Sequence, residues 1–252
     1  MSRTMSRTAA PTRRTAPRRA MILAAGLGKR MRPITATTPK PLVRVAGRSL
    51  LDRALDRLQA AGVEDVVINV HYLADLVEQH ARRHKGGPRV HISDERQKLL
   101  DTGGAIRKAL PLLGEDPFFL LNSDTLWLEG PQPNLDLLAG DWDGERMDIL
   151  LLMAPTATSL GYEGRGDFAM DPSGRLTRRP EREVVPFAYA GVAIIRPQLF
   201  ADAPEGPFSL NRIFDAVAEQ GRLYGTRIEG QWLHVGTPEA LRAAEKRFAT
   251  TD

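Results

Sequence analysis

A short stretch near the beginning of the chain contains the residue types that bind a row of phosphate groups. Gly26 and Gly28 follow an apolar segment, and glycine lets a backbone turn approach a ligand closely because it has no Cβ atom. Backbone N–H groups in such a turn can donate to phosphate oxygens, and fixed cations add charge-assisted hydrogen bonds. Four cations follow within the same stretch: Lys29, Arg30, Arg32 and Lys40. The stretch is therefore predicted to hold the triphosphate of a nucleotide.

Two common glycine loops do not fit this stretch. A Walker A loop has Ser or Thr after its Gly-Lys pair, whereas Arg30 follows Gly28-Lys29 here. A Rossmann fingerprint has a third small residue and continues directly into a helix, whereas this chain has Met31 and then several prolines. These prolines fix φ and keep the segment out of a helix. A dehydrogenase is disfavoured on these grounds, and failure to bind NAD(H) would complete its exclusion.

The full pattern from Gly26 to Leu42 is G-x-G-x-R-x-x-P-x-T-x-x-x-P-K-P-L, and it resembles the sugar-1-phosphate nucleotidyltransferases. These enzymes join an NTP and a sugar 1-phosphate into an NDP-sugar and release pyrophosphate. The resemblance covers residues 21–247. It implies an α/β fold of the Rossmann-like, nucleotide-diphospho-sugar transferase type, with a mixed, mainly parallel sheet and helices on both faces.

The resemblance also implies roles for residues of this stretch. Arg30 would steady the leaving pyrophosphate, and Lys40 would reach the α-phosphate and the incoming phosphate. Positioning and electrostatic stabilisation dominate such a transfer, because a phosphate monoester is already an anionic nucleophile and needs no strong general base. The predicted nucleotide-binding residues of the stretch are Leu23, Ala24, Ala25, Gly26, Gly28, Lys29, Arg30 and Lys40.

A second glycine-rich turn, within Leu100–Ala105, opens a predicted helix. Glycine at the start of a helix is destabilising unless something approaches closely there. On the residues alone, Gly103 and Gly104 suit a simple helix start. The resemblance implies instead that they pack against the nucleobase, and Glu95, shortly before, is predicted to line the same pocket.

Asp124 follows the apolar segment Phe118–Leu121. A carboxylate at the carboxyl end of a central strand is costly to bury unpaired, and ligands of doubly wound sheets bind at such ends. An Asp that only caps a loop is the plainer alternative. The resemblance places the Mg²⁺-binding Asp of the family at this position, so Asp124 is the predicted metal ligand.

The segment Trp232–Glu239 resembles the closing motif of the family, with one departure. His234 stands where the family usually has an Asp that is the second Mg²⁺ ligand. Mg²⁺ prefers oxygen ligands, whereas imidazole suits later metals and Mn²⁺ tolerates both. Direct ligation, ligation through water and no ligation are all open. We expect His234 to act through water or through another ligand, with Mg²⁺, or else Mn²⁺, as the cofactor.

The predicted sugar site comes from the second half of the chain. The run Gly164-Arg165-Gly166-Asp167-Phe168 looks like that of the uridylyltransferases that act on N-acetylmuramate 1-phosphate in cell-wall recycling. A Tyr-Ala-Gly segment resembles the Asn-Ala-Gly segment of the family's sugar site. The sugar-binding residues implied by these likenesses are Arg165, Gly166, Asp167, Tyr189, Ala190 and Gly191.

The predicted reaction is nucleotidyl transfer from an NTP to a sugar 1-phosphate. UTP with N-acetylmuramate 1-phosphate is the favoured pair, and GTP with mannose 1-phosphate is the alternative. A different class of function also stays open, namely a non-catalytic protein that binds a nucleotide-sugar and regulates a partner. Release of pyrophosphate separates the enzymes from the regulatory protein.

The chain around these motifs alternates between predicted strands and helices. Leu51, Leu55 and Leu58, for example, recur at helical spacing, and Gly62 ends that helix. The alternation predicts parallel strands with ligands at their carboxyl ends. A turn at 171–174 joins two further strands as a hairpin. The main predicted strands are 20–25, 65–70, 89–93, 118–121, 148–153 and 186–195, and the predicted helices are 49–61, 73–83, 100–113, 133–138, 209–220 and 239–248.

Composition divides the chain into two parts. Residues 1–19 are rich in Ser, Thr, Arg and Pro and are predicted to be a disordered basic extension, whether native, targeting or a start-site artefact. Residues 20–252 are predicted to form a single nucleotidyltransferase domain with a nucleotide half (about 20–125) and a sugar half (about 126–252). Six arginines in the extension account for the positive charge: Arg3, Arg7, Arg13, Arg14, Arg18 and Arg19.

Several classes of function are disfavoured by composition. Without the extension the chain is slightly acidic, so no nucleic-acid partner is expected. No apolar run is long enough to span a bilayer, and no membrane partner is expected. The absence of cysteine excludes disulfides and thiolate sites and fits a cytoplasmic location. The sequence leaves the oligomeric state open.

Overall fold

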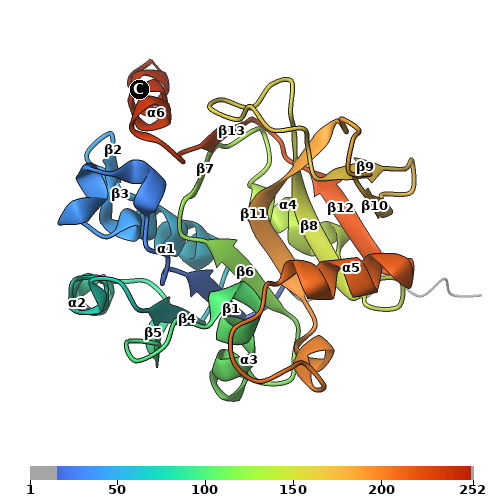
Figure 1. Ribbon diagram of the computed structural model, residues 1–252, viewed down its shortest axis with the longest axis horizontal. Helices are drawn as coiled ribbons and strands as arrows, with labels where there is room; N and C mark the ends of the chain where they lie inside the picture. Colours follow the sequence, from blue (N-terminus) through green and yellow to red (C-terminus); the bar gives the residue numbers. More distant parts are fainter. Residues whose placement is uncertain (1–15, 251–252) are drawn as a thin grey trace, which may run out of the picture.

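The structure is a computed structural model that describes residues 16–250. The described residues are built around a nine-stranded sheet (Figure 1). Its main path runs in the order β10-β9-β11-β6-β1-β4-β5, and β8 joins β11 to β12. The strands are β1 (Arg19–Leu23), β4 (Asp65–Val70), β5 (Arg89–Asp94), β6 (Phe118–Asn122), β8 (Ile149–Pro155), β9 (Phe168–Met170), β10 (Leu176–Arg178), β11 (Phe187–Ile195) and β12 (Leu223–Arg227).

The parallel part of the sheet positions the loops that carry the predicted nucleotide site. β1 lies between β4 and β6 and runs parallel to both, and β5 continues this parallel order beyond β4. The carboxyl ends of β1, β4 and β6 therefore meet at one edge. β11 runs antiparallel to β6 and β8, so the sheet is mixed and continues through both halves of the chain.

Alternating apolar side chains bury both faces of the sheet. In β1, Ala20 and Ile22 face one core and Met21 faces the other, as the two-residue period of a strand requires. The first core is covered by α1 (Leu50–Ala60), α2 (Ala74–Arg83) and α4 (Asn134–Asp141). The second is covered by α3 (Asp101–Leu113) and α5 (Asn211–Glu219) (Figure 1).

A third, smaller apolar cluster holds the carboxyl-terminal elements against the first loop. It contains residues of α6 (Pro238–Ala249) together with β7 (Thr125–Leu128) and β13 (Gln231–His234), which pair as an antiparallel ribbon. Val45 of the short strand β2 (Arg44–Val45), which pairs with β3 (Arg48–Ser49), contributes to it as well. Met31 is fully buried in this cluster, so the segment between Gly28 and Lys40 is anchored at its middle.

Most of the predicted elements are found within one or two residues of their predicted bounds. The hairpin at 171–174 is confirmed and joins β9 to β10. The largest difference is at the end of α4, which extends to Asp141 instead of 138. β1 ends at Leu23, which leaves Ala24 and Ala25 in the following loop, and α5 begins only at Asn211. Residues 1–15 of the predicted disordered extension lie outside the described residues. Arg19, its last residue, is already the first residue of β1.

Asp65 ties the start of β4 to the edge strand β5. Its carboxylate accepts hydrogen bonds from Arg89 Nε and Nη2 at 2.9 and 2.7 Å and lies 2.7 Å from His91 Nε2. These bonds, those of Arg89 foremost, lower the pKa of Asp65 to about 2. A carboxyl group with a lowered pKa stabilises the fold above its ordinary pKa, and this contribution is lost as the pH falls toward the lowered value.

We therefore expect Asp65→Asn to lower the free energy of unfolding at pH 7 by about 1 kcal/mol, since the largely exposed Arg89 is screened by solvent. Urea unfolding should show the same difference in unfolding free energy between the two proteins at pH 7 and pH 5, and a smaller difference at pH 3. A difference that does not narrow at pH 3 would show that the carboxylate charge is not its cause. Asp136→Asn, on the exposed surface of α4, is the matched control.

Candidate active site

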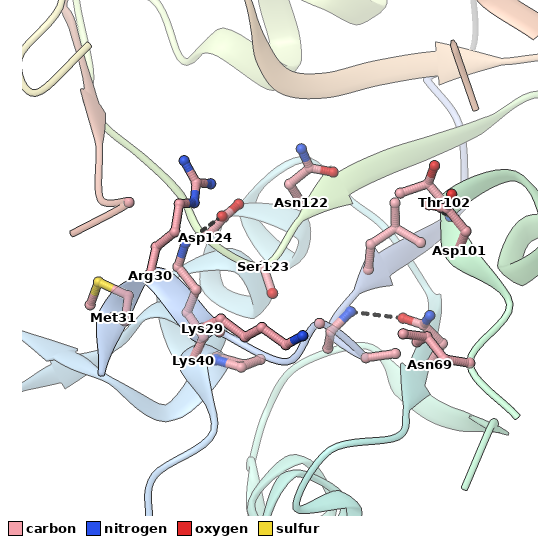
Figure 2. Close-up of a pocket in the computed structure, with 18 residues that line it drawn as sticks. Lys29, Arg30, Met31, Lys40, Asn69, Asp101, Thr102, Asn122, Ser123 and Asp124 are labelled. Atoms are coloured by element: carbon pink, nitrogen blue, oxygen red, sulfur yellow. Dashed lines mark hydrogen bonds and ion pairs between the residues drawn. The ribbon is translucent and has the colours of Figure 1, made fainter. Parts of the chain in front are cut away.

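A cavity of about 390 Å³ opens at the carboxyl ends of β1, β4 and β6. Eight predicted nucleotide-binding residues line it, together with the predicted metal ligand Asp124 (Figure 2). The eight are Leu23, Ala24, Ala25, Gly26, Gly28, Lys29, Arg30 and Lys40. The structure therefore places the glycine- and cation-rich stretch and the Asp that follows β6 in one cavity. Their contacts with a nucleotide stay a prediction.

The loop after β1 is held in shape by local contacts. Gly28 has φ +61°, a left-handed conformation that favours glycine. Its carbonyl accepts a hydrogen bond from Thr35 Oγ1 at 2.7 Å, and a Cβ atom on Gly28 would lie only 3.0 Å from the Thr35 methyl group. Buried Met31 fixes the next turn. Lys29 and Arg30 remain exposed and, among residues 16–250, form no ion pair.

Lys40 and Asp124 form the central contact of the cavity. Lys40 Nζ lies 2.6 Å from Asp124 Oδ2, although the two residues come from different loops (Figure 2). The Lys40 side chain is 11% exposed and its ammonium group is therefore held in place, while the Asp124 side chain is 32% exposed. Pro39 and Pro41 on either side stiffen the backbone that carries Lys40. A cation fixed in this way can stabilise developing charge with little reorganisation.

His234 lies next to Asp124 because of the register between two strands. In the β7–β13 ribbon it is opposite Thr125, the residue after Asp124. Its ring packs against Tyr162 and Trp232, and Gly236 leaves room for the ring, since a Cβ atom there would lie 2.8 Å from His234 Nε2. Burial lowers the pKa of His234, and the charges of Lys40 and Arg30 lower it further against the opposing effect of Asp124.

The two predicted metal ligands are thus neighbours, and their chemistry fits a divalent cation. A lowered pKa keeps the His234 imidazole neutral near pH 7, which is the form that binds metals. Lys40 contacts Oδ2 of Asp124, and the other carboxylate oxygen, Oδ1, has no hydrogen-bond partner among the described residues. Residues 16–250 contain no cluster of three or more His, Asp or Glu side chains that could hold a metal ion. Many Mg²⁺ sites have only one or two protein ligands and are completed by substrate phosphates and water, and Asp124 and His234 fit a site of that kind.

Glu95 is buried and does not line the main cavity. Its Oε1 accepts from Asn69 Nδ2 at 2.8 Å and its Oε2 accepts from the Leu100 N–H at 3.0 Å. Asn69 Oδ1 in turn accepts from the Ala24 N–H at 2.7 Å (Figure 2). Both carboxylate oxygens of Glu95 are thus used within the protein, one by the Asn69 side chain and one by the Leu100 N–H. A role of Glu95 toward the nucleotide stays a prediction.

We expect Asn69→Ala to lower the free energy of unfolding by about 2–4 kcal/mol, because it leaves the Ala24 N–H and the Glu95 carboxylate buried without this partner. The affinity for an NTP should fall as well, since Ala24 lines the cavity. Urea unfolding and nucleotide titration measure the two effects. Asn211→Ala, at the exposed start of α5, is the control, and equal stability of both variants would contradict the network.

Gly103 and Gly104 pack against another segment of the chain, and their predicted contact with a nucleobase stays a prediction. They lie in the first turn of α3, and their N–H groups donate to the Phe208 carbonyl at 2.9 and 3.2 Å. A Cβ atom on Gly103 would meet the Phe208 ring at 2.3 Å, and one on Gly104 would meet the Gly206 carbonyl oxygen at 2.3 Å. The absence of a side chain at these two glycines therefore lets residues 206–208 pack against the start of α3. The cavity is lined instead by Leu99, Asp101 and Thr102.

None of the predicted sugar-binding residues lines this cavity, although Ala190 and Gly191 lie beside the end of β6. Asp167 Oδ2 accepts from the Tyr189 N–H at 2.8 Å, and the Ala190 carbonyl accepts from Thr125 Oγ1. The Tyr189 hydroxyl is buried without a hydrogen-bond partner among the described residues, and burial raises its pKa. Gly166 and Gly191 both have positive φ, and Arg165 is exposed. Their role toward a sugar stays a prediction.

Nine cavity residues were not among the predicted site residues: Met31, Pro41, Asn69, Leu99, Asp101, Thr102, Asn122, Ser123 and Gly236. Most of them lie within or beside the segments that carried predicted residues. Asn69 lies outside those segments, and its one hint in the sequence is that it is a polar residue inside an apolar strand. Among the described residues no helix has the length and apolar character needed to cross a bilayer.

Known proteins match this chain in sequence and in fold. The family model described as "Nucleotidyl transferase" matches residues 19–251. The chain is 51% identical over 93% of its length to N-acetylmuramate alpha-1-phosphate uridylyltransferase of Caulobacter vibrioides, of which it covers 98%. It is 35% identical over 90% of its length to the protein of that name from Neisseria meningitidis, covering 96% of it.

More distant matches share the reaction class or the fold. Mannose-1-phosphate guanylyltransferase catalytic subunit beta of Danio rerio is 32% identical over 88% of the chain, which spans 62% of that protein. A solved structure of UDP-glucose pyrophosphorylase complexed with UDP-glucose superposes with a TM-score of 0.75 at 17% identity, over 93% of this chain and 99% of that one. HddC from Yersinia pseudotuberculosis complexed with GMP-PN gives 0.72 at 22% identity, over 91% and 99%. These two structures share the nucleotide-diphospho-sugar transferase fold with the chain.

Proposed function

The chain belongs to the nucleotidyl transferase family, and on that premise we propose that it transfers a uridylyl group from UTP to N-acetylmuramate 1-phosphate. The products are the UDP-sugar and pyrophosphate. The observation that carries the choice of substrates is the 51% identity to the Caulobacter vibrioides uridylyltransferase, which extends over 93% of this chain and 98% of that protein. N-acetylmuramate is a cell-wall sugar, so the proposed role is peptidoglycan recycling, in the cytoplasm where UTP is available.

In the proposed reaction the phosphate oxygen of the sugar 1-phosphate attacks the α-phosphorus of UTP, and pyrophosphate leaves on the opposite side. Lys40, held by Asp124, stabilises charge on the α-phosphate and aligns the incoming phosphate. Arg30 and Lys29 line the same cavity and are free to bind the β- and γ-phosphates that become pyrophosphate. The glycine turn supplies backbone N–H groups without a side chain in the way.

Asp124 and His234 are the residues that would hold Mg²⁺ in this reaction, with phosphate oxygens and water completing the coordination. When bound, such an ion neutralises phosphate charge and orients the groups that react. The unpartnered Asp124 Oδ1 is an oxygen donor of the kind that Mg²⁺ prefers. His234 contributes a neutral nitrogen, which fits water-mediated contact with Mg²⁺ and direct contact with Mn²⁺.

We expect His234→Ala to raise the Mg²⁺ concentration needed for half-maximal rate about tenfold or more, as loss of a supporting ligand does in other metal sites. The kcat at saturating Mg²⁺ should change little, and direct titration with Mn²⁺ should show weaker binding in the presence of UTP. His91→Ala, which is remote from the cavity, is the control. Unchanged metal dependence in both titrations would remove His234 from the metal site.

Pyrophosphate release from a matrix of substrates tests the proposed function. UTP, GTP, CTP, ATP and dTTP are combined with N-acetylmuramate, N-acetylglucosamine, mannose and glucose 1-phosphates, with Mg²⁺ and Mn²⁺ in parallel. Fastest turnover with UTP and N-acetylmuramate 1-phosphate is the expected result. Fastest turnover with GTP and mannose 1-phosphate would show that the proposed reaction is right and the proposed substrates are wrong. Nucleotide binding with no pyrophosphate release from any pair would show that the protein is a regulatory binding protein and not an enzyme.

A further inference from the structure

The main cavity has opposite charges at its two ends. Lys29, Arg30 and Lys40 come from the loop after β1, and all three line the cavity. Asp101 lines the wall at the start of α3, across the cavity from these cations (Figure 2). The cations attract the triphosphate, whereas the Asp101 carboxylate repels it. A nucleotide in this cavity is therefore oriented with its phosphates toward the loop and its base toward Asp101.

Asp101 has an unfavourable backbone conformation. Its φ is +57°, in the left-handed region that glycine adopts freely and that residues with a Cβ atom, Asn and Asp less than others, adopt at a cost. Its Oδ1 accepts a hydrogen bond from the Thr102 N–H at 2.6 Å. Its Oδ2 has no hydrogen-bond partner among the described residues, and the residue is exposed to the cavity. A carboxylate oxygen is thus presented to the base end at an energetic cost that glycine would avoid.

The other polar groups of this wall are already used by the protein. The Gly103 and Gly104 N–H groups donate to the Phe208 carbonyl, and Thr102 Oγ1 accepts from the Leu210 N–H at 2.8 Å. The N–H groups of Thr102, Gly103 and Gly104 are therefore all donated to acceptors within the protein. Asp101 Oδ2 remains as an acceptor, and the complementary group on a base is a ring N–H.

We propose that Asp101 determines which bases the cavity accepts, by receiving a hydrogen bond from a ring N–H of the nucleobase. Uracil presents N3–H to such an acceptor, as thymine does, and guanine presents N1–H. Cytosine presents the N3 lone pair and adenine the N1 lone pair, and both are repelled by a carboxylate. The proposal rests on the proposed function in one respect, namely that an NTP occupies this cavity with its phosphates on the cations.

Asp101→Asn is the sharpest test because it keeps the shape of the side chain. The amide oxygen can still accept from the Thr102 N–H, which leaves the NH₂ donor in place of Oδ2. Asn also tolerates positive φ. We expect the affinity for UTP to fall and that for CTP to rise, so that the UTP-to-CTP affinity ratio decreases about tenfold to a hundredfold, the size of a hydrogen bond to a charged group.

Two further variants separate base selection from other effects. Asp101→Gly relieves the backbone and removes both the helix contact and the carboxylate, so the UTP-to-CTP ratio should fall without inverting. Asp136→Asn removes one negative charge on exposed α4, away from the cavity, and should leave the ratio unchanged. If Asp101 only stabilises the start of α3, Asp101→Asn will behave as wild type and Asp101→Gly will weaken all nucleotides equally, which overturns the proposal.

The affinities are measured by titrating each protein with UTP, CTP, GTP and ATP at fixed Mg²⁺ without any sugar 1-phosphate. This readout is independent of turnover. A wild-type protein that binds UTP and GTP more tightly than CTP and ATP, yet releases no pyrophosphate, would retain the Asp101 proposal while the proposed function fails. A wild-type protein that turns over UTP but binds CTP equally well would overturn the Asp101 proposal while the proposed function stands.

Discussion

Lys40→Ala is expected to reduce kcat by about a hundredfold or more, the loss found when one preorganised donor to a developing oxyanion is removed. Lys40 is the buried cation of the cavity, and its ammonium group is fixed at 2.6 Å from Asp124 Oδ2. Its charge is therefore positioned before substrates bind. Pyrophosphate release at saturating UTP and sugar 1-phosphate measures the effect. Circular dichroism and thermal unfolding establish that the variant folds normally.

Lys40→Met and Lys29→Met make the comparison with Lys40→Ala sharper. Methionine keeps most of the apolar stem that Lys40 buries, so a loss of kcat in Lys40→Met reports the missing charge. Lys29 is exposed and lines the same cavity, and Lys29→Met should mainly raise KM for UTP. Near-wild-type kcat in Lys40→Met would show that Lys40 is not the residue that stabilises the transition state.

Asp124→Asn is the second substitution for which a loss of about a hundredfold or more in kcat is expected, by the same electrostatic argument. The amide keeps the shape of the side chain but removes the negative charge that holds Lys40 Nζ and the oxygen donor available to a metal. The metal concentration needed for half-maximal rate should rise together with the fall in kcat. A fall in kcat with unchanged metal dependence would show that Asp124 positions Lys40 and does not bind the metal.

A double-mutant cycle separates the two tasks of Asp124. If it only positions Lys40, Lys40→Met combined with Asp124→Asn will lose no more activity than Lys40→Met alone. If it also holds the metal, the double variant will lose more, and the extra loss will be accompanied by the change in metal dependence. Because Lys40 and Asp124 are in direct contact, simple additivity of the two losses is not expected.

The sequence predicted the features that depend on neighbouring residues. The spacing of glycines, cations and prolines between Gly26 and Leu42 predicted the phosphate-binding loop, and its residues do line one cavity. Helical and strand periodicity predicted the main elements, because a face that is buried must repeat with the period of its element. The apolar segment before Asp124 likewise predicted a strand that ends in a carboxylate.

Partners that are distant in the sequence could not be predicted from local patterns. The family resemblance implied that Gly103 and Gly104 pack against a nucleobase, whereas the neighbours that need the space in the structure are Phe208 and Gly206. Glu95 has the chemistry of a pocket residue, but its oxygens are taken by Asn69 and the Leu100 N–H. A single sequence does not say whether a small or charged residue faces a ligand or another part of its own chain.

The sequence by itself therefore determined the family, the reaction class and the loop that is predicted to hold the phosphates, since these follow from short-range pattern. Only the tertiary structure decided which side chains meet. The order β4-β1-β6 brings Asn69 and Asp124 to the loop after β1, and the register of β13 on β7 brings His234 beside Asp124. The fold also places Asp101 opposite the cations. Strand order and register arise from packing over the whole core, and for that reason no local stretch of the sequence contains them.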